Sequence, residues 1–600
     1  MATAYTPQLE KMAGMGIVEH ELRNEYNATF GNARPQSSMR KSESDVTMDR
    51  FTGDMHVDAE QPAGLARMEA ITIVWTRNWL ICAYVAILLI SFINSLQQQA
   101  SFSWTPYVTS MFKEHGLTAI TGVVANIVGG VSRLPLAKLI DLVGRPQGFL
   151  VCLVCVVLSL VLMADSPNVQ SYAAAQTFYW SGMNGIDYVF SVFIADTSLL
   201  QNRLIWNAFQ GAPYICNTFA GPLLGDAFEH HSTWRWGFGI FAIITPIVSL
   251  PFLGVFWMMG RRAKNLGVVE REKSNRTFPQ SVRHWFVEFD VIGLLLVCGG
   301  FSIFLLPLSL AGYQKEGFTS PMIICMIIFG LVILALFAVW ERFYAPKTFF
   351  PFHLMKNRDV VAACLLGANT WIAFYSYKMY YSSYLQVVFQ LSIAKAGFIT
   401  NIFNIVSCTW AVLISFAFKA TDTYKWGAII ALPVQVTMTG LMIHFRRPGT
   451  PIGLLVMVEV INAMAVANLV QIEQVAIMAA VPHENVAVGL ALLGMITAVG
   501  GAIGQSVSGA IWTQIVRKRM VEYLPEANKV QAAAIFGDIK LQLALPWGSP
   551  ERDAIIRAYA DAQKLMVIVG TCALVPCFLW VFMLKNYRMS EHKNRKGLQA

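Results

Sequence analysis

Charged side chains are scarce in this sequence, since Asp, Glu, Lys and Arg together make up 14% of its 600 residues. A soluble globular protein carries roughly 25% charged residues, because it needs them to cover its surface. Apolar residues reach 55%, and the mean hydropathy is +0.50. The composition therefore excludes a soluble protein and predicts an all-α protein embedded in a lipid bilayer.

Signatures of several other protein classes are also absent. The ten Cys all lie in apolar runs, which excludes a disulfide scaffold, and the CxxC formed by Cys152 and Cys155 is interpreted as core packing. The ten His lie in tails, in loops or near the ends of apolar runs, without paired-ligand spacing, so no metal site is predicted. No nucleophile–base constellation or cofactor motif indicates an enzyme. The net charge of +9 sits in loops between apolar runs, which is typical of an oriented membrane protein and gives no sign of a nucleic-acid partner.

Fourteen apolar segments are predicted to be membrane-spanning helices, which need about 20 residues each. They lie at 79–99, 117–136, 148–164, 171–192, 204–225, 236–258, 290–311, 321–341, 359–379, 394–417, 426–444, 451–478, 487–512 and 565–584. The short loops predicted on the inner side hold seventeen Lys and Arg residues, among them Arg133, against six on the outer side. The positive-inside rule and the even number of spans therefore predict that both termini are cytosolic.

These spans divide the chain into halves, with polar segments around them. The predicted parts are 1–78 as a disordered cytosolic tail, 79–258 as an amino-terminal half of six helices, 259–289 as a basic cytosolic loop, 290–341 as two linking helices, 342–584 as a carboxyl-terminal half of six helices, and 585–600 as a cytosolic tail. The second half includes an extracellular segment, 513–564. Within it, Gly548-Ser549-Pro550-Glu551 supplies an N-cap, a proline at the first helical position and an acid in the first turn, so a helix is expected to begin there and to continue into the last span.

A polar motif lies between the second and third spans. Residues 137–146 resemble the G-x-L-x-D-R-x-G-R signature of the major facilitator superfamily, with Asp141, Gly144 and Arg145 matching the pattern. Ala137 and Leu142 replace a glycine and an arginine of the signature. Gly144 would permit a tight turn, while Asp141 and Arg145 would form a charge-assisted latch at the inner surface. An ordinary polar turn is the alternative.

A second, partial motif lies in the fifth span. Gly221-Pro222-Leu223-Leu224-Gly225 resembles the G-x-x-x-G-P-x-x-G-G element of proton-linked drug antiporters, although Asn217 and Asp226 stand in place of glycines. Small residues and a proline allow helices to approach closely and to bend. Close packing is therefore favoured over a direct role in the direction of transport.

Several longer stretches share a further resemblance. They are 94–99, 185–188, 195–198, 234–238, 351–354, 384–388, 473–483, 500–504 and 548–552. Together, over roughly residues 65–590, they resemble the fungal siderophore–iron transporters, a fourteen-span branch of the major facilitator superfamily. The resemblance implies two six-helix halves with two helices between them, and the uptake of a ferric chelate with protons.

Ionisable residues inside membrane spans are costly and indicate function. Asp187, Glu459 and Glu473 are therefore candidates for proton coupling. Glu459 and Glu473 are fourteen residues apart, so they lie within about 40° of each other on one helical face. A static ion pair or a carboxylate that reaches the interface is the alternative.

Polar and aromatic residues supply the candidate surface for substrate. Asn94, Gln97 and Gln98 share one face of the first span, and a tyrosine-rich stripe ends the ninth span. The members of that stripe are Tyr377, Tyr380, Tyr381 and Tyr384, and the ionisable Lys378 at the outer end of the same span is a further candidate for binding substrate. For the tyrosines, an aromatic belt at the membrane interface is the alternative.

The extracellular segment supplies candidates for an outer gate. These are Trp547, Arg552, Arg557 and Tyr559, of which Arg552 and Tyr559 share a helical face because they are seven residues apart. The alternative is a folded cap that stabilises the last two spans.

The sequence thus predicts a monomeric transporter that imports ferric siderophores by proton symport and alternating access. Its partners would be the siderophore, protons and the bilayer, with no cofactor, because the iron arrives already wrapped by its chelator. The plasma membrane is the expected location, with an endosomal or vesicular membrane as the alternative. The competing functions are a fourteen-span drug–proton antiporter and a non-transporting nutrient sensor.

Overall fold

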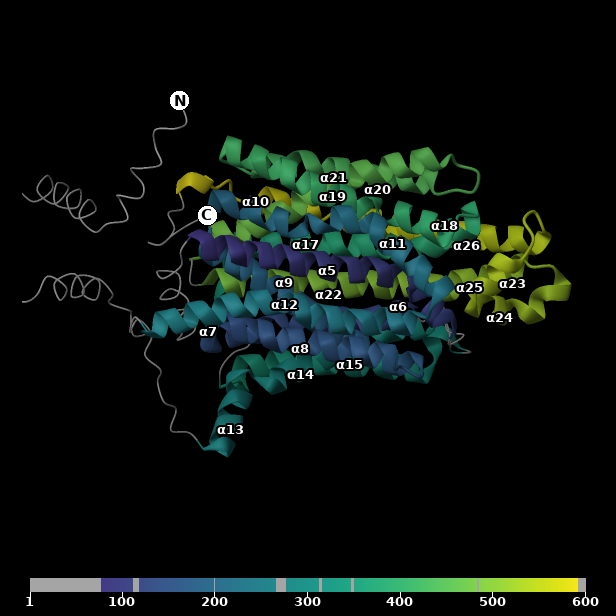
Figure 1. Cartoon of the computed structure of the whole chain (residues 1–600). Helices are drawn as coiled ribbons and strands as arrows, with labels where there is room; N and C mark the ends of the chain where they lie inside the picture. Colours follow the sequence, from purple (N-terminus) through teal and green to yellow (C-terminus); the bar gives the residue numbers. More distant parts are fainter. Residues whose placement is uncertain are drawn as a thin grey trace, which may run out of the picture. The chain divides into compact units, whose positions relative to one another are not determined.

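The computed structural model describes residues 77–111, 118–198, 200–265, 277–311, 314, 316–346, 350–482 and 485–591. Three parts of the predicted polar segments lie outside these ranges. They are residues 1–76 of the tail predicted over 1–78, residues 266–276 of the predicted basic loop, and residues 592–600 of the predicted carboxyl-terminal tail. Throughout the described ranges the regular elements are all helices, which confirms the all-α class (Figure 1).

Two spans predicted in the first half are each built from two helices. The elements are α5 (Arg77–Met111), α6 (Thr118–Val131), α7 (Arg133–Val143), α8 (Arg145–Ala164), α9 (Val169–Thr197), α10 (Leu200–Gly211), α11 (Pro213–His231) and α12 (Trp234–Asn265). The α6–α7 pair breaks at Ser132, because Pro135 has no N–H to donate to the carbonyl of Val131. The α10–α11 pair breaks at Ala212, where Pro213 begins the next helix.

The linking region and the second half follow the predicted order. Their main elements are α13 (Phe278–Glu288), α14 (Val291–Leu310), α15 (Pro321–Val339), α16 (Phe352–Met355), α17 (Arg358–Lys378), α18 (Tyr381–Phe389), α19 (Ile393–Thr421), α20 (Lys425–Phe445), α21 (Ile452–Ala480), α22 (Val486–Ile511), α26 (Pro550–Leu574) and α27 (Cys577–Met583). The predicted loop 259–289 is thus partly helical. Helix α13 starts at a capping box, in which the backbone N–H of Thr277 donates to Gln280 Oε1 at 3.1 Å, and it points away from the other helices in Figure 1.

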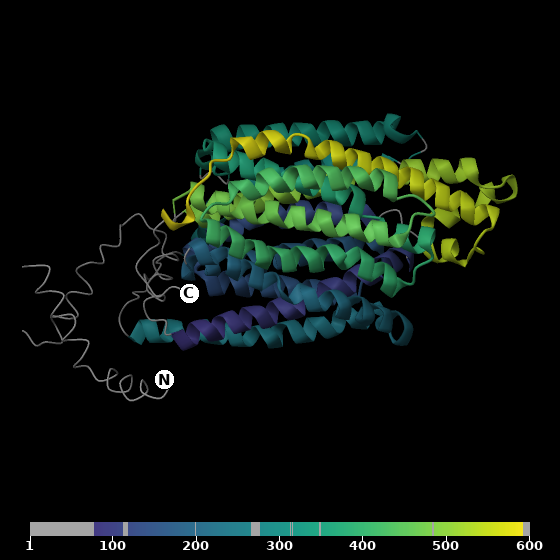
Figure 2. The same cartoon turned by 90° about the horizontal axis from the view of Figure 1, so that it is seen from above.

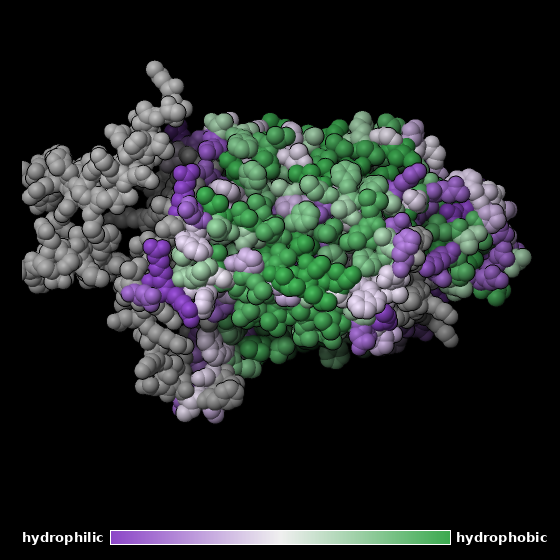
Figure 3. Space-filling model, viewed as in Figure 1, coloured by the Kyte–Doolittle hydropathy of each residue, from purple (hydrophilic) through white to green (hydrophobic). Residues whose placement is uncertain are grey.

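In the described part of the chain, eleven helices are long and apolar enough to cross a membrane. The three remaining predicted spans correspond to α6–α7, to α9 and to α10–α11. The first and third are broken, and α9 carries polar residues along its 29-residue length. Figure 3 shows a broad band of hydrophobic side chains with hydrophilic residues at both ends, as expected for helices in a bilayer. The number of fourteen spans and the cytosolic location of both termini remain predictions.

The segment predicted over 513–564 is helix-rich, as expected. It contains the π-helix η6 (Trp512–Val516), α23 (Arg517–Tyr523), the 3₁₀ helix η7 (Glu526–Gln531), α24 (Ala532–Gly537) and α25 (Ile539–Ala544). We call residues 517–549 the cap. Figures 1 and 2 both place the cap beyond one end of the long helices. Helix α26 then begins as predicted, with Ser549 Oγ accepting from the backbone N–H of Arg552 at 3.2 Å, and runs through 25 residues into the last span.

After α27, residues 584–591 fold back onto the second half. Asp359 of α17 accepts hydrogen bonds from the backbone N–H of Lys585 at 2.6 Å and from Tyr587 Oη at 3.1 Å. Asp422, which follows α19, accepts from the backbone N–H of Ser590 at 2.8 Å. The short 3₁₀ helix η8 (Met589–Glu591) also contacts α10 of the first half. We call residues 584–591 the strap.

Candidate functional site

A cavity of about 630 Å³ lies between the helices of the two halves. From the first half its wall includes Gln97, Gln98, Ser101, Asn126, Arg133, Gln176, Tyr179, Trp180, Asn184, Asp187, Tyr188, Ser191 and Tyr214. From the second half it includes Trp371, Tyr375, Lys378, Tyr380, Ser382, Ser383, Thr400, Asn401, Asn404, Glu473, Gln474, Thr497 and Gln505. Its size falls within the range of small-molecule sites, about 300–1,000 Å³, and amides, hydroxyls and aromatic rings dominate its wall.

One carboxylate from each half reaches this cavity. Asp187 of α9 is open to it, and its Oδ1 accepts a hydrogen bond from Gln210 Nε2 at 3.5 Å. Glu473 of α21 is 2% exposed, and its Oε1 has no hydrogen-bond partner among the described residues. A methyl group at Gly367 of α17 would lie 2.8 Å from Glu473 Oε2, so the glycine is what allows the carboxylate to fit between these helices. The two carboxylates have different surroundings: Asp187 is open, whereas Glu473 is enclosed.

The third proton-coupling candidate, Glu459, lies outside the cavity wall. It sits in a buried ion cluster, where Lys378 Nζ donates to its Oε1 and Arg446 Nη2 donates to its Oε2 at 3.3 Å. Arg446 is further fixed by a 3.0 Å hydrogen bond from Nη1 to the carbonyl oxygen of Tyr377. This arrangement is the static ion pair that the sequence left open as an alternative. A role of Glu459 in proton transfer stays a prediction.

The polar face predicted on α5 is only partly directed at the cavity. Gln97 Oε1 accepts a hydrogen bond from Tyr179 Oη, and Gln98 Oε1 accepts one from Tyr214 Oη at 2.5 Å. Both glutamines line the cavity, whereas Asn94 is buried outside its wall. Tyr179 and Tyr214 were not among the sequence candidates, and they orient the glutamines that were.

The tyrosine stripe is buried, so it does not form a lipid-facing belt. Tyr377, Tyr380, Tyr381 and Tyr384 are each at most 1% exposed. Of these four, the cavity wall includes Tyr380, whose ring stacks on Trp512 with centroids 4.1 Å apart and planes 2° apart. Lys378, the further substrate candidate on this span, also reaches the cavity from the ion cluster described above.

The outer-gate candidates lie outside the cavity wall. Arg552 and Tyr559 are buried and both reach Gln542 of α25: Arg552 Nη1 donates to its carbonyl oxygen, and Tyr559 Oη donates to its Oε1 at 2.5 Å. Arg552 Nη2 also donates to the carbonyl oxygen of Val387 in α18 at 2.8 Å. These contacts attach the cap to the helices. Trp547 and Arg557 are exposed, and a gating role for the four residues stays a prediction.

The predicted latch is built around a glycine-dependent turn. Gly144 joins α7 to α8 with a φ of +120°, which residues with a side chain rarely adopt. Arg145 is buried, and its Nε donates to Asp196 Oδ2 of α9 at 3.0 Å. The Asp141 side chain lies outside the described side chains. The ion pair that the structure describes for Arg145 therefore fastens α8 to α9.

Arg133 is the main cavity residue that the sequence analysis did not select. The charge pattern places it among the basic loop residues, but its side chain lines the cavity, and its Nη2 donates to Asn184 Oδ1 at 2.7 Å. A signal was available, because the predicted span 117–136 contains Arg133 and ionisable residues inside spans indicate function.

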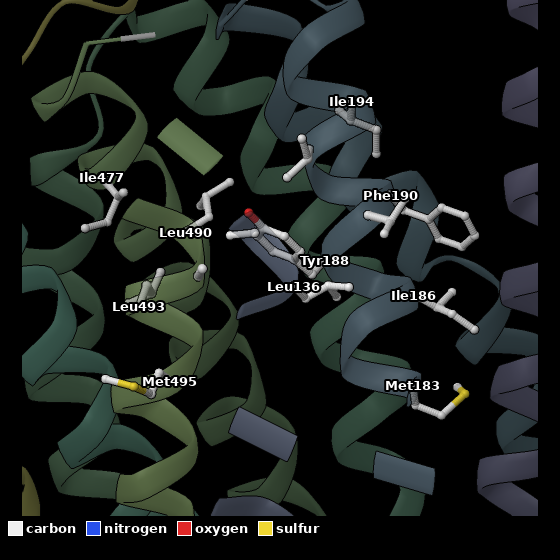
Figure 4. Close-up of a cluster of buried hydrophobic side chains, with 14 of the residues drawn as sticks. Leu136, Met183, Ile186, Tyr188, Phe190, Ile194, Ile477, Leu490, Leu493 and Met495 are labelled. Carbon is white, nitrogen blue, oxygen red and sulfur yellow. The ribbon is translucent and has the colours of Figure 1, made fainter. Parts of the chain in front are cut away.

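The two halves also touch directly beside the cavity. Tyr188 Oη of α9 donates to the carbonyl oxygen of Ala487 in α22 at 2.9 Å, and Figure 4 shows the Tyr188 ring pointing towards Leu490 of α22. A second hydrogen bond between the halves runs from Asn404 Nδ2 of α19, which lines the cavity, to Gln99 Oε1 of α5 at 3.3 Å. These contacts join the helices that must separate if the cavity is to open.

Known proteins resemble this chain over most of its length. A family model for the Major Facilitator Superfamily matches residues 87–355. MFS siderochrome iron transporter 1 of Ajellomyces capsulatus is 42% identical over 94% of this chain and 97% of its own length. Siderophore iron transporter mirB of Emericella nidulans is 37% identical over 92% of this chain and 91% of its own length.

Solved structures share the fold at low sequence identity. A bacterial homolog to the human lysosomal transporter Spinster superimposes with a TM-score of 0.52 at 12% identity, covering 85% of this chain and 98% of that protein. A peptide transporter POT in complex with sulfate gives a TM-score of 0.51 at 13% identity, covering 87% and 99%. These two structures support the major facilitator fold alone. The identity to curated relatives over nearly the whole chain shows more: the protein belongs to the siderophore–iron transporter family of the major facilitator superfamily.

Proposed function

We propose that this protein imports ferric siderophores together with protons, by alternating access to the cavity between its two halves. The observation that carries this proposal is one cavity, between the halves, that receives a carboxylate from each of them. Relatives named as siderophore–iron transporters support the substrate class.

The cavity wall suits a metal chelate better than a bare ion. A ferric siderophore brings its iron already coordinated, so the protein needs hydrogen-bonding groups and flat rings instead of metal ligands. The amides of Gln97 and Gln98 and the rings of Trp371 and Tyr375 supply such groups. Iron is thus the cargo, held by the chelator, and the protein has no resident cofactor in this proposal.

Glu473 is the stronger candidate for carrying the coupled proton. Its carboxylate is enclosed and has an unpartnered Oε1, and a charge in such a place is costly. The neutral acid therefore suits the closed site, and proton release belongs to the step in which the site opens to cytosolic water. One charge that moves through 100 mV supplies about 2.3 kcal/mol, enough for a gradient of roughly 50-fold.

The test is uptake of radiolabelled iron, presented with a panel of pure siderophores to cells that lack their own carriers. We expect concentrative uptake of at least one chelate, faster in acidic medium and abolished by a protonophore. Glu473→Gln and Asp187→Asn should each lose concentrative uptake at normal surface abundance, whereas Glu526→Gln, on the surface of the cap, should not.

Three results would contradict the proposal. Uptake that is insensitive to pH and protonophore would exclude proton symport. Normal accumulation by both carboxylate variants would show that these residues only pack. Efflux of preloaded drugs without siderophore uptake would favour the drug–proton antiporter instead.

A further inference from the structure

We propose that Arg133 is a positioning residue, which couples the charge of Asp187 to the contact between the two halves at the inner end of α22. This inference deepens the proposed proton coupling and rests on it. It assigns a role to Arg133, a cavity cation that shares the α9 wall with Asp187 and also lies against α22 of the opposite half.

The break between α6 and α7 directs Arg133 into the cavity. As the first residue of α7, Arg133 follows the interruption at Ser132, and its guanidinium turns towards α9. There Nη2 donates to Asn184 Oδ1 at 2.7 Å, while Nε is buried and has no hydrogen-bond partner among the described residues. The guanidinium is therefore anchored to α9 through Nη2.

Asp187 lies on the same part of the wall. Asn184 and Asp187 are three residues apart on α9, so they share a helical face, and Asp187 lines the same cavity as Arg133. In the described chain, the titratable groups that act on Asp187 are Arg133 of α7, Tyr179 of α9 and Tyr214 of α11. Arg133 is the cation of this set, so it is the group that a charged Asp187 attracts.

The other charges of the cavity come from the second half. Glu473 is enclosed beside Gly367, and Lys378 is already paired with Glu459. The net charge at the α9 side of the cavity wall therefore depends on Asp187 and Arg133.

The guanidinium also lies directly against the opposite half. A methyl group at Gly494 of α22 would be 2.1 Å from Arg133 Nη1 and 2.7 Å from its Cδ, so only a glycine leaves room for this approach. The hydrogen bond from Tyr188 to Ala487 joins the same two halves two turns earlier on α22. An opening of the cavity at this end has to separate α22 from both Arg133 and Tyr188.

These contacts give the charge of Asp187 a mechanical consequence. While Asp187 is ionised, its charge offsets that of the guanidinium across the shared cavity wall, so the side of Arg133 that packs against α22 carries a compensated charge. Protonation of Asp187 leaves the guanidinium uncompensated in that contact, where its Nε is buried and unpartnered among the described residues, and this is unfavourable until α22 moves away and more water reaches the cation. Proton binding therefore promotes separation of α22 at its inner end, the step that a proton symporter needs before it releases its cargo inside.

Alkylation of a cysteine introduced by Ala487→Cys tests this inference without any siderophore. The full chain, in lipid nanodiscs, is treated with a maleimide at acidic and at neutral pH. The rate at this position is read by peptide mass spectrometry and divided by the rate of the unfolded protein at the same pH. We expect about fivefold or more faster alkylation at acidic pH, which is the lower end of usual coupling between sites.

The same measurement in second variants isolates Arg133. When Asp187→Asn is added to Ala487→Cys, the introduced cysteine should be alkylated fast at both pH values. With Arg133→Gln it should be alkylated slowly at both. Arg133→Lys should keep part of the acceleration at acidic pH, because it keeps the charge. Gly494→Ala displaces the guanidinium without removing it, so it should react fast at neutral pH. Gly254→Ala in α12, where an added methyl meets nothing within 4 Å, should behave as the parent protein.

Two outcomes would overturn the inference. One is a parent-like pH response in Arg133→Gln, and the other is parent-like alkylation of Gly494→Ala at both pH values. The second variant keeps the test decisive if Arg133→Gln fails to fold. Failure of the proposed function has a different signature, since uptake by the unmodified protein would then ignore pH and protonophore whatever the alkylation rates show.

Discussion

At the scale of single residues, the cluster of Lys378, Arg446 and Glu459 sets one carboxylate against two cations in a buried place. Glu459→Gln would leave both cations without their counter-ion. Removing one partner of a buried pair costs roughly 3–5 kcal/mol, so we expect a marked fall in the thermal unfolding temperature of the purified protein.

A double variant provides the control for this cluster. Lys378→Met together with Glu459→Gln removes one cation as well, and it should recover part of the lost stability. If Glu459→Gln instead unfolds at the parent temperature and changes the pH dependence of uptake, Glu459 carries protons and is not a structural ion.

Gly144 provides a second prediction at this scale. Because its φ of +120° is unfavourable for any residue with a Cβ, Gly144→Ala should lower the free energy of unfolding by about 1–3 kcal/mol. Thermal unfolding of Gly254→Ala is the matched control, since that glycine lies within α12 and its added methyl meets nothing. Equal unfolding temperatures for Gly144→Ala and the parent would show that the α7–α8 turn relaxes without cost.

At the scale of elements, the attachment of the cap depends on α26. Arg552 donates to Gln542 of α25 and to Val387 of α18, so it binds two elements to a third. Arg552→Gln should loosen the cap and expose it to protease added outside intact cells. Arg557→Gln removes the same charge from an exposed position of the same helix, so it should leave the cleavage rate unchanged.

The contrary result would be informative about gating. If Arg552→Gln resists protease as the parent does but loses siderophore uptake, the arginine contacts substrate or closes the outer side of the cavity. The cap would then be part of the transport cycle and not only a support for α26.

The elements that line the cavity include parts of the three predicted spans whose membrane character is weakest in the sequence. Helix α9 carries Gln176, Asn184 and Asp187, and α6–α7 and α10–α11 are interrupted. Apolar runs predicted the location of these helices, because helices in lipid need long apolar surfaces. The breaks in these helices depend on Pro135 and Pro213. The length of an apolar run does not show where a proline interrupts the helix.

At the scale of the molecule, the sequence predicted the helices and the family better than the site. Asp187, Glu473, Gln97 and Gln98 could be identified, since polar residues inside apolar spans are conspicuous. Arg133 could not be separated from loop cations by counting charges. The structural roles of Glu459 and Arg552 depend on partners that lie more than ten residues away or on other helices. Periodicity along one helix does not reveal such partners.

Topology gives a prediction for the whole chain. Its N-glycosylation sequons are Asn27-Ala28-Thr29, which lies outside the described residues, and Asn275-Arg276-Thr277, of which the structure describes Thr277, and both are predicted to be cytosolic. Neither should carry glycan, so endoglycosidase should leave the electrophoretic mobility unchanged. A shift that disappears in Asn275→Gln would reverse the predicted orientation.

The strap has a consequence for the biogenesis of the protein. Residues 584–591 are synthesised after α17 and α19. During the intervening part of translation, Asp359 and Asp422 therefore lack the hydrogen-bond donors that the strap provides. A chain that stops before the strap keeps the Asp359 carboxylate without the hydrogen bonds from Lys585 and Tyr587. The hydrogen bonds of Asp359 and Asp422 described here can therefore form only after residues 585–590 have been made and have folded back onto the second half.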